Sequence, residues 1–366
     1  MEHVLGMIDL MNDGAHLSAL TRCRCTGAVP FGGRYRLADF ALSNLSRAGI
    51  RKVAVLPSPK ADSLLRHMGD GRHHGLETLE TLHEAYGDWP YGRNCLDALQ
   101  SRQETYVLIA PSSVIYLSPY ERMMEDHIGS GADITVLYKH WSELDSYAHM
   151  GQAYRLEMNE HGRVVQAVPA YHALPDQSPQ NIGLDTFIMK RDLLIDLGRF
   201  RAKQQRSLTM SELVWAHLDE LDVHGFMNHG YAANIDSIDS YYAHSMHLLQ
   251  PQGWRQFMQH QEAVYTRPNE EQAIACHPQA LIRNAFVAPG CRIEGYVENS
   301  ILFAGVAVQP GAQVRNSVIM HDCVIEAGAV LDKVILDKEV TIERETVVRG
   351  EYTHPYVGEK HGVLSS

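Results

Sequence analysis

Two glycines and two arginines lie close together in the stretch VPFGGRYRLADF, which spans residues 29–40. Backbone amides of glycine-rich turns and arginine side chains are groups that proteins use to hold phosphate oxygens. An apolar run, VLGMIDL (residues 4–10), precedes this stretch, and a glycine-rich loop after such a strand would complete a phosphate site. The residues that follow are instead MNDGAH (residues 11–16), with one glycine and no arginine. The sequence therefore predicts a phosphate-handling edge that has lost its glycine-rich loop.

The elements that position this edge alternate between short apolar runs and helical patterns up to about residue 245. Buried strands are predicted over residues 4–10, 52–57, 106–110 and 132–139. Helices are predicted over residues 37–49, 60–68 and 120–131, the first ending at Gly49 and the third at Gly129 or Gly131. This alternation predicts an α/β, Rossmann-like domain whose mostly parallel sheet is covered on both faces. Because ligands bind beyond the carboxyl ends of such strands, VPFGGRYR and the loop after YVLIA belong at that edge.

The second half of the chain carries a repeat. The matching units are VAPGCRI (287–293), VQPGAQV (308–314), IEAGAVL (325–331) and IERETVV (342–348). Their hexapeptide periodicity predicts a parallel β-helix with three short strands per coil of about 17–18 residues. The expected division is a first domain over 1–245, a linker over 246–280 and the β-helix over 281–366. Because its outermost coils leave strand edges open, we expect the β-helix to pack against the first domain or another subunit.

Composition limits the classes of function. A net charge of −12 over 366 residues argues against general binding to nucleic acid or anionic membranes. No export signal or long apolar segment is evident, so we expect a cytoplasmic protein. The six cysteines are too few and too scattered for a disulfide framework. His73 and His74, in the glycine-flanked stretch GDGRHHG, are predicted to be exposed to solvent rather than bound to a metal.

Four stretches, in this order, carry a family resemblance: VPFGGRYRLADFALSNLSRAGI, VLIAPSSVIYLSPY, GYAANIDSIDSYY and VRNSVIMHDCVIEAGAVLDKVILDKEV. Together they resemble the glucose-1-phosphate adenylyltransferase family, also called ADP-glucose pyrophosphorylase, over nearly the whole chain. The resemblance implies a nucleotidyltransferase domain followed by a left-handed β-helix. It also implies the reaction of ATP with glucose 1-phosphate, which gives ADP-glucose and pyrophosphate for bacterial glycogen synthesis.

The resemblance also implies that the family's catalytic groups are replaced in this chain. Met11 and Asn12 stand at the two leading glycines of the family's GGxGTR loop, and His16 stands at its arginine. Thr26 and Val168 stand where the family has lysines, in its KPAV segment and in the VEKP-like segment that holds the sugar phosphate. We therefore expect no intact catalytic set.

The two aspartates that hold Mg²⁺ in the family match Ser113, in PSSVIY, and Asn234, in YAANIDS. Neutral side chains are poor ligands for Mg²⁺. The pattern is similar to that of the GlgD-type subunit of the family, a weakly catalytic or non-catalytic paralogue. It implies no cofactor for this chain alone, Mg²⁺ in a catalytic GlgC-type partner, and a hetero-oligomer, expected to be a tetramer.

Small anionic regulators bind members of this family between the two domains, and the family's arginines there match Arg24 and Arg36. Arginine's planar fork suits phosphate oxygens. Cys23 stands where the family has a neighbouring lysine, which weakens the match for sugar bisphosphates. The alternative is that both arginines pair with local acids such as Asp39.

Two other functions stay open. The chain could be an active nucleotidyltransferase with other metal ligands, for which Asp97, Asp185 and Asp236 are the candidate carboxylates. It could also be a β-helix acyltransferase with His321, which lies inside the repeats, as its base. The sequence favours the subunit without catalytic groups over both.

Overall fold

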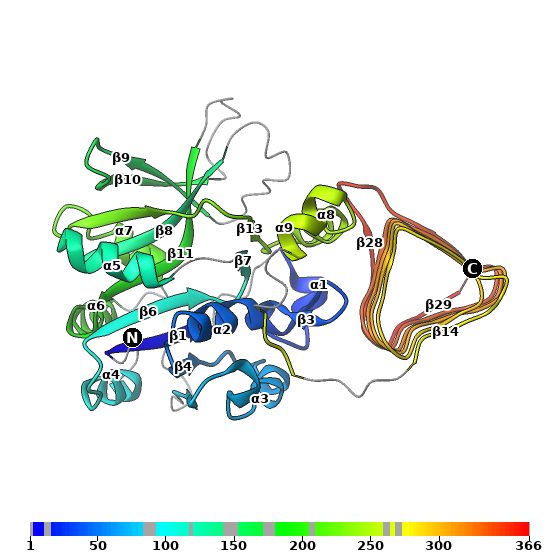
Figure 1. Ribbon diagram of the computed structural model, residues 1–366, viewed down its shortest axis with the longest axis horizontal. Helices are drawn as coiled ribbons and strands as arrows, with labels where there is room; N and C mark the ends of the chain where they lie inside the picture. Colours follow the sequence, from blue (N-terminus) through cyan, green and yellow to red (C-terminus); the bar gives the residue numbers. More distant parts are fainter. Residues whose placement is uncertain are drawn as a thin grey trace.

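The computed structural model describes residues 3–10, 16–82, 93–116, 120–141, 153–170, 180–204, 209–258, 264–267 and 273–365. The first domain is built on a nine-stranded sheet, with the β-helix at the other end of the molecule (Figure 1). The main path of the sheet runs β10 (Val164–Pro169), β9 (Tyr154–Met158), β11 (Gln180–Lys190), β6 (Tyr106–Pro111), β1 (Val4–Asp9), β4 (Lys52–Leu56) and β5 (Thr78–Thr81). Two further strands complete it, β8 (Ile134–Trp141), which pairs with β11, and β12 (Val223–Met227), which pairs with β8.

The neighbouring strands β6, β1, β4 and β5 are parallel, and β11 runs antiparallel to β6. The four strands predicted from the sequence are β1, β4, β6 and β8, so these predictions are confirmed. The three predicted helices are α2 (Leu37–Arg47), α3 (Asp62–Met68) and α5 (Tyr120–Ser130). Gly49 and Gly131 follow α2 and α5 with φ of 72° and 69°, the left-handed conformation expected where a helix ends.

Helices cover both faces of the sheet, so alternate side chains of a central strand pack against helices on opposite sides. Ile8 of β1 packs into a core that includes residues of α2, α3 and α5. Met7, the preceding residue, packs into a second core with residues of α4 (Arg93–Gln100), α6 (Arg191–Gln204) and α7 (Met210–Trp215). Because successive strand side chains point to opposite faces, the apolar run of β1 is buried on both sides.

The repeats form a left-handed β-helix of triangular cross-section (Figure 1). Its first side is the parallel sheet β14 (Ala275–Cys276), β17 (Arg292–Ile293), β20 (Ala307–Val308), β23 (Val324–Ile325), β26 (Thr341–Ile342) and β29 (Val363–Leu364). The second is β15 (Leu281–Arg283), β18 (Tyr296–Glu298), β21 (Gln313–Arg315), β24 (Val330–Asp332) and β27 (Val347–Arg349). The third is β16 (Phe286–Val287), β19 (Ile301–Leu302), β22 (Val318–Ile319), β25 (Val334–Leu336) and β28 (Tyr356–Gly358).

One side of the β-helix packs against the first domain. Ile301 of β19, Val318 of β22 and Ile335 of β25 share an apolar cluster with residues of α1 (Ser18–Thr21), β2 (Pro30–Phe31), β3 (Tyr35–Arg36) and α8 (Ile238–His247). The Tyr242 hydroxyl of α8 donates to the Asn316 carbonyl at 2.6 Å. The expected packing against the first domain is therefore confirmed, but it uses a flat side of the prism rather than the open edges of the end coils.

The segment between the domains contains the end of α8 and the helix α9 (Pro251–Met258). The predicted boundary at residue 245 thus falls inside α8. Within the described ranges, no helix is both long enough and apolar enough to cross a membrane.

Candidate functional site

The carboxyl edge of the parallel strands is the place where the sequence predicts ligand chemistry. There β1 ends at Asp9 and β6 at Pro111. The positions of Met11 and Asn12 lie outside the described residues. His16, the next predicted site residue, is exposed, and its carbonyl accepts from the amide of Ile238 at 3.2 Å. The backbone of His16 therefore joins this edge to the first turn of α8.

Ser113 and Asn234 come together, as the resemblance implies for two metal positions. Ser113 directly precedes β7 (Val114–Tyr116), and Asn234 is the last residue of β13 (Ala232–Asn234), which pairs with β7. The amide of Ile235 donates to the Ser113 carbonyl at 2.9 Å. The Asn234 amide group donates to Asp236 Oδ2 at 3.2 Å. Two neutral side chains thus lie close together, one at the end of β13 and the other just before the strand that pairs with it.

Thr26 lies at the same edge. It begins the short helix η1 (Thr26–Ala28) and is 1% exposed. A Cβ placed on the next residue, Gly27, would lie 2.8 Å from Ser112 Cβ, so this turn packs directly against the residue before Ser113. Val168, by contrast, lies on β10, where it pairs with Arg155 of β9 at the opposite end of the sheet path from β5. Neither side chain can offer a positive charge to a phosphate.

Carboxylates that the sequence left as alternatives also gather here. Asp185 sits where the pairing of β11 with β8 is interrupted, with φ of 49°. Ser211 Oγ donates to Asp185 Oδ1 at 2.5 Å. Burial raises the pKa of Asp185 to about 6, and the charges of Asp9 and Asp236 act in the same direction. Asp97 does not join them, because it is exposed on α4.

These residues do not fit the Mg²⁺ that the family implies. Mg²⁺ favours carboxylate oxygens in close octahedral arrangement. The two predicted ligand positions carry a hydroxyl and an amide. Across the described ranges, the one set of three histidine, cysteine, aspartate or glutamate ligand atoms close enough for a metal lies elsewhere, at Asp39, His67 and His74. No catalytic step through Mg²⁺ follows from this geometry.

A second group of charged residues lies between the domains. Arg24 is 6% exposed and binds both carboxylate oxygens of Asp337, directly after β25, at 2.6 and 2.5 Å. The guanidinium of Arg36 donates to the carbonyl oxygen of Ser63 at 2.8 Å and to the hydroxyl of Ser63 at 3.0 Å. Arg24 therefore pairs with an acid of the β-helix, and not with Asp39 as the local alternative had it. The backbone amide of Arg36 donates to Asp39 at 2.9 Å, and the charge of Asp39 also acts on the Arg36 side chain.

Two further residues face these arginines: Lys338, which the sequence analysis did not single out, and His321, which it named only as a candidate acyltransferase base. Burial lowers the pKa of Lys338 to about 8, and the charges of Arg36 and Arg24 lower it further. Burial lowers the pKa of His321 to about 3, with the charges of Lys338 and both arginines in the same direction. Near pH 7 His321 is therefore neutral, whereas Arg24, Arg36 and Lys338 bring positive charge between the domains and Asp337 pairs with Arg24. His321 faces the first domain here, a position that gives no support to its use as an acyltransferase base.

A mostly parallel α/β sheet with a hexapeptide β-helix docked beside its ligand edge defines a nucleotidyltransferase with a hexapeptide-repeat domain. Residues 13–250 match the nucleotidyl transferase family, and residues 273–354 match the GlmU-like, C-terminal hexapeptide family. The chain belongs to the glucose-1-phosphate adenylyltransferase family.

Relatives of this family align along nearly the whole chain. The glycogen biosynthesis protein GlgD of Bacillus subtilis (strain 168) is 30% identical over 366 residues, which covers 97% of this chain and 95% of that protein. The glucose-1-phosphate adenylyltransferase of Bacillus cytotoxicus is 29% identical over 369 residues, 96% of each chain. The enzyme of the same name from Bacillus mycoides is 29% identical over 358 residues, 92% of each. Family membership and fold predicted from the sequence are thus confirmed.

Proposed function

We propose that this chain is a regulatory and structural subunit of glucose-1-phosphate adenylyltransferase in glycogen biosynthesis, weak or inactive as a catalyst by itself. The observation that carries the proposal is the closeness of Ser113, which directly precedes β7, to Asn234 of the paired strand β13. The family's metal-binding aspartates match these two positions, and both side chains are neutral. Loss of charge-stabilising groups of this kind lowers catalytic rates by orders of magnitude.

The charge of the surrounding edge supports the same conclusion. Asp185 lies near enough to Asp9 and Asp236 for their charges to raise its pKa. ATP would bring several negative charges to this edge, where Thr26 stands in place of one family lysine, and Val168 on β10 stands in place of the other. Repulsion between like charges therefore adds to the loss of the metal.

The proposed partner is a catalytic subunit of the same family, which would hold the Mg²⁺, in a cytoplasmic hetero-oligomer. The proposed regulator is a small anion, such as a sugar phosphate or inorganic phosphate, bound beside Arg36 and Lys338. Arg24 is already paired with Asp337, so an anion reaches it only by displacing that carboxylate. This competition predicts a weaker response to anions than open arginines would give.

ADP-glucose formation from ATP, glucose 1-phosphate and Mg²⁺ tests the proposal. The assay compares this chain alone, the catalytic subunit of the same organism alone, and the two co-expressed. We expect no turnover from this chain alone and an altered rate or anion response in the mixture. Robust turnover by the isolated chain, or a mixture identical to the catalytic subunit alone, would refute the proposal.

The anion site has its own test within the mixed enzyme. Arg36→Ala should shift the concentration of phosphate or sugar phosphate needed for half-maximal response. Arg34→Ala is the matched control, because Arg34 is exposed in the same turn two residues away. Equal response curves for the two variants would remove Arg36 from the regulator site and leave the subunit proposal intact.

A second function, an active nucleotidyltransferase with replaced metal ligands, is favoured by one observation, the closeness of Asp185 to Asp9 and Asp236. It predicts Mg²⁺-dependent turnover by the isolated chain, lost in Asp236→Asn. Turnover that survives this substitution would exclude Asp236 as a ligand.

A further inference from the structure

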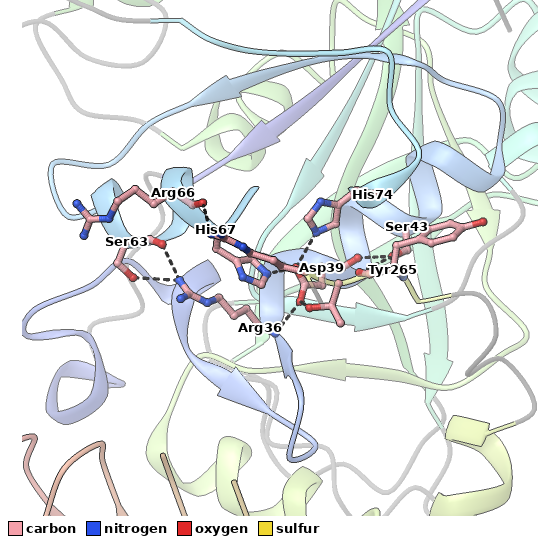
Figure 2. A network of polar contacts seen from close by, with 10 residues as sticks. Arg36, Asp39, Ser43, Ser63, Arg66, His67, His74 and Tyr265 are labelled. Carbon is pink, nitrogen blue, oxygen red and sulfur yellow. Dashed lines mark hydrogen bonds and ion pairs between the residues drawn. The ribbon is translucent and has the colours of Figure 1, made fainter. Parts of the chain in front are cut away.

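Asp39 lies where three elements of the first domain meet. It belongs to the first turn of α2, His67 belongs to α3, and His74 ends the short helix η2 (Arg72–His74). Figure 2 shows both imidazoles directed at the same carboxylate. His67 Nε2 lies 2.8 Å and His74 Nε2 3.0 Å from Asp39 Oδ1. Both histidines thus present the same ring nitrogen to one oxygen atom.

The three residues are removed from solvent to different degrees. The side chains of Asp39 and His74 are fully buried, and that of His67 is 11% exposed. The prediction that His73 and His74 are both exposed is therefore wrong for His74, whereas His73 is exposed. The physical reason is tertiary: Asp39 is a buried charge in an apolar helix face and must be matched by polar partners. His67 marks the side from which a small ion or water would enter.

The two imidazole rings converge on Asp39 through their Nε2 atoms. The planes of His67 and His74 meet at 69° with centroids 5.8 Å apart, a T-shaped arrangement in which both Nε2 atoms reach Asp39 Oδ1. His74 Nδ1 is buried without a hydrogen-bond partner among the described residues. The polar contact that orients this buried ring is therefore the one at Nε2.

The donor set matches a transition-metal site. The three ligand atoms all lie within 4.8 Å of one another. Zn²⁺ binds imidazole nitrogen and carboxylate oxygen at about 2.0–2.2 Å, which places tetrahedral ligands roughly 3.3 Å apart. The distances from Asp39 Oδ1 to the Nε2 atoms of His67 and His74 are 2.8 and 3.0 Å. Each would need to lengthen by about 0.3–0.5 Å to admit the ion. Mg²⁺ and Ca²⁺ prefer all-oxygen sites and fit this set poorly.

We propose that Asp39 Oδ1, His67 Nε2 and His74 Nε2 bind one transition-metal ion, with Zn²⁺ as the best match. Three protein ligands leave a fourth position for water on the side of His67. Two positive groups nearby make their hydrogen bonds to other groups: the Arg36 guanidinium donates to Ser63, although its charge still acts on Asp39, and Arg267 donates to the carbonyl of Arg66. The buried carboxylate balances half of the ion's charge.

The ion would serve the connection between the domains. The second oxygen, Asp39 Oδ2, accepts from Thr266 Oγ1 at 2.7 Å and from the amide of Arg36 at 2.9 Å. Ser43 of α2 accepts from the amide of Tyr265 at 2.8 Å (Figure 2). Residues 264–267 precede the β-helix, so one ion would tie α2, α3 and η2 to the segment that leads into it. Such outer hydrogen bonds to a ligating carboxylate fix its orientation.

Metal binding by the purified full-length chain tests the site. The protein is stripped of metal with a chelator and titrated with Co²⁺, whose visible absorption reports low-coordinate sites, and then with competing Zn²⁺. The variants are His67→Gln, His74→Gln and Asp39→Asn. His73→Gln is the matched control, because His73 is exposed and directly precedes His74. We expect one equivalent of Co²⁺ per chain, displacement by Zn²⁺, and a higher melting temperature with Zn²⁺ bound.

Each site variant should weaken binding by at least about 10–100-fold, whereas His73→Gln should bind as the original protein does. Absence of the Co²⁺ bands at one equivalent would overturn the proposal and leave Asp39 as a hydrogen-bonded junction. Bands of equal strength in His67→Gln and in the original protein would also overturn it. Because His67 lies at the exposed margin, this variant is the decisive one if His74→Gln or Asp39→Asn fails to fold.

Discussion

The ion pair between Arg24 and Asp337 should dominate the coupling between the two domains. Arg24 belongs to the first domain and Asp337 to the β-helix, and their side chains are 7% and 3% exposed. Substituting Asp337→Asn removes the charge and keeps the shape, so Arg24 stays buried without its counter-charge. Breaking a buried pair in this way costs about 3–5 kcal/mol. We expect a loss of stability of that size.

The chain supplies its own control. Arg22 and Glu359 also link the first domain to the β-helix, but their side chains are 68% and 51% exposed. An exposed pair contributes about 0–1 kcal/mol, so Glu359→Gln should leave stability nearly unchanged. Replacing both partners of the buried pair, in Arg24→Met with Asp337→Leu, should recover most of the loss, because no uncompensated charge is left.

Urea unfolding with two probes measures this effect. The tryptophans, at positions 89, 141, 215 and 254, all precede the β-helix, so their fluorescence reports the first domain. Far-ultraviolet circular dichroism reports both domains. The two transitions should coincide in the original protein and separate in Asp337→Asn. Inorganic phosphate should stabilise Asp337→Asn more than the original protein, since it can replace the missing carboxylate. If Asp337→Asn costs no more than Glu359→Gln, the coupling assigned to this pair is refuted.

Three further changes have defined outcomes. The pKa of Asp185 is raised from about 4 to about 6 in the folded protein, because burial favours its protonated form. The stability that the protonated carboxyl contributes is therefore fully present below pH 4 and is lost as the pH rises through 6. Asp185→Asn should therefore stabilise the protein by about 1–3 kcal/mol at pH 8 and by little at pH 4, in urea titrations at both pH values. Because the pKa of His321 is lowered to about 3, stability should fall by about 2 kcal/mol from pH 7 to pH 5, and His321→Gln should abolish that fall. Gly27→Ala places a Cβ 2.8 Å from Ser112 and should lower the melting temperature, with a cost of about 1–3 kcal/mol.

Features fixed by local sequence could be predicted. Gly49 and Gly131 end their helices because the left-handed conformation is nearly free of steric cost for glycine. The 17-residue repeat is also seen in the structure, because residues 17 positions apart pair on neighbouring strands: Val308 with Ile325, and Ile325 with Ile342. The helix-ending glycines and the repeat are each determined by residues close together in the sequence, so both can be predicted without knowledge of distant contacts.

Features fixed by distant contacts could not be predicted. Arg24 and its partner Asp337 are separated by 313 positions, and the local acid Asp39 was a nearer alternative in sequence alone. His74 is buried because α2 brings a carboxylate to it from 35 positions away. One signal was available: Asp39 is the single charge in the apolar stretch LADFAL, and a charge on a buried helix face requires polar partners.

The distribution of charge explains why function should move from the nucleotide edge to the domain interface. At the edge, Asp185 is held close to other carboxylates, and neutral groups replace the cations that a triphosphate requires. At the interface, burial and the charges of Arg36 and Arg24 lower the pKa of Lys338, and the charge of Asp337 opposes this shift, so an entering anion would add to the one acid already there. The proposed anion regulation therefore rests on the region where the two domains meet, and the comparison of Arg36→Ala with Arg34→Ala decides whether an anion is bound there.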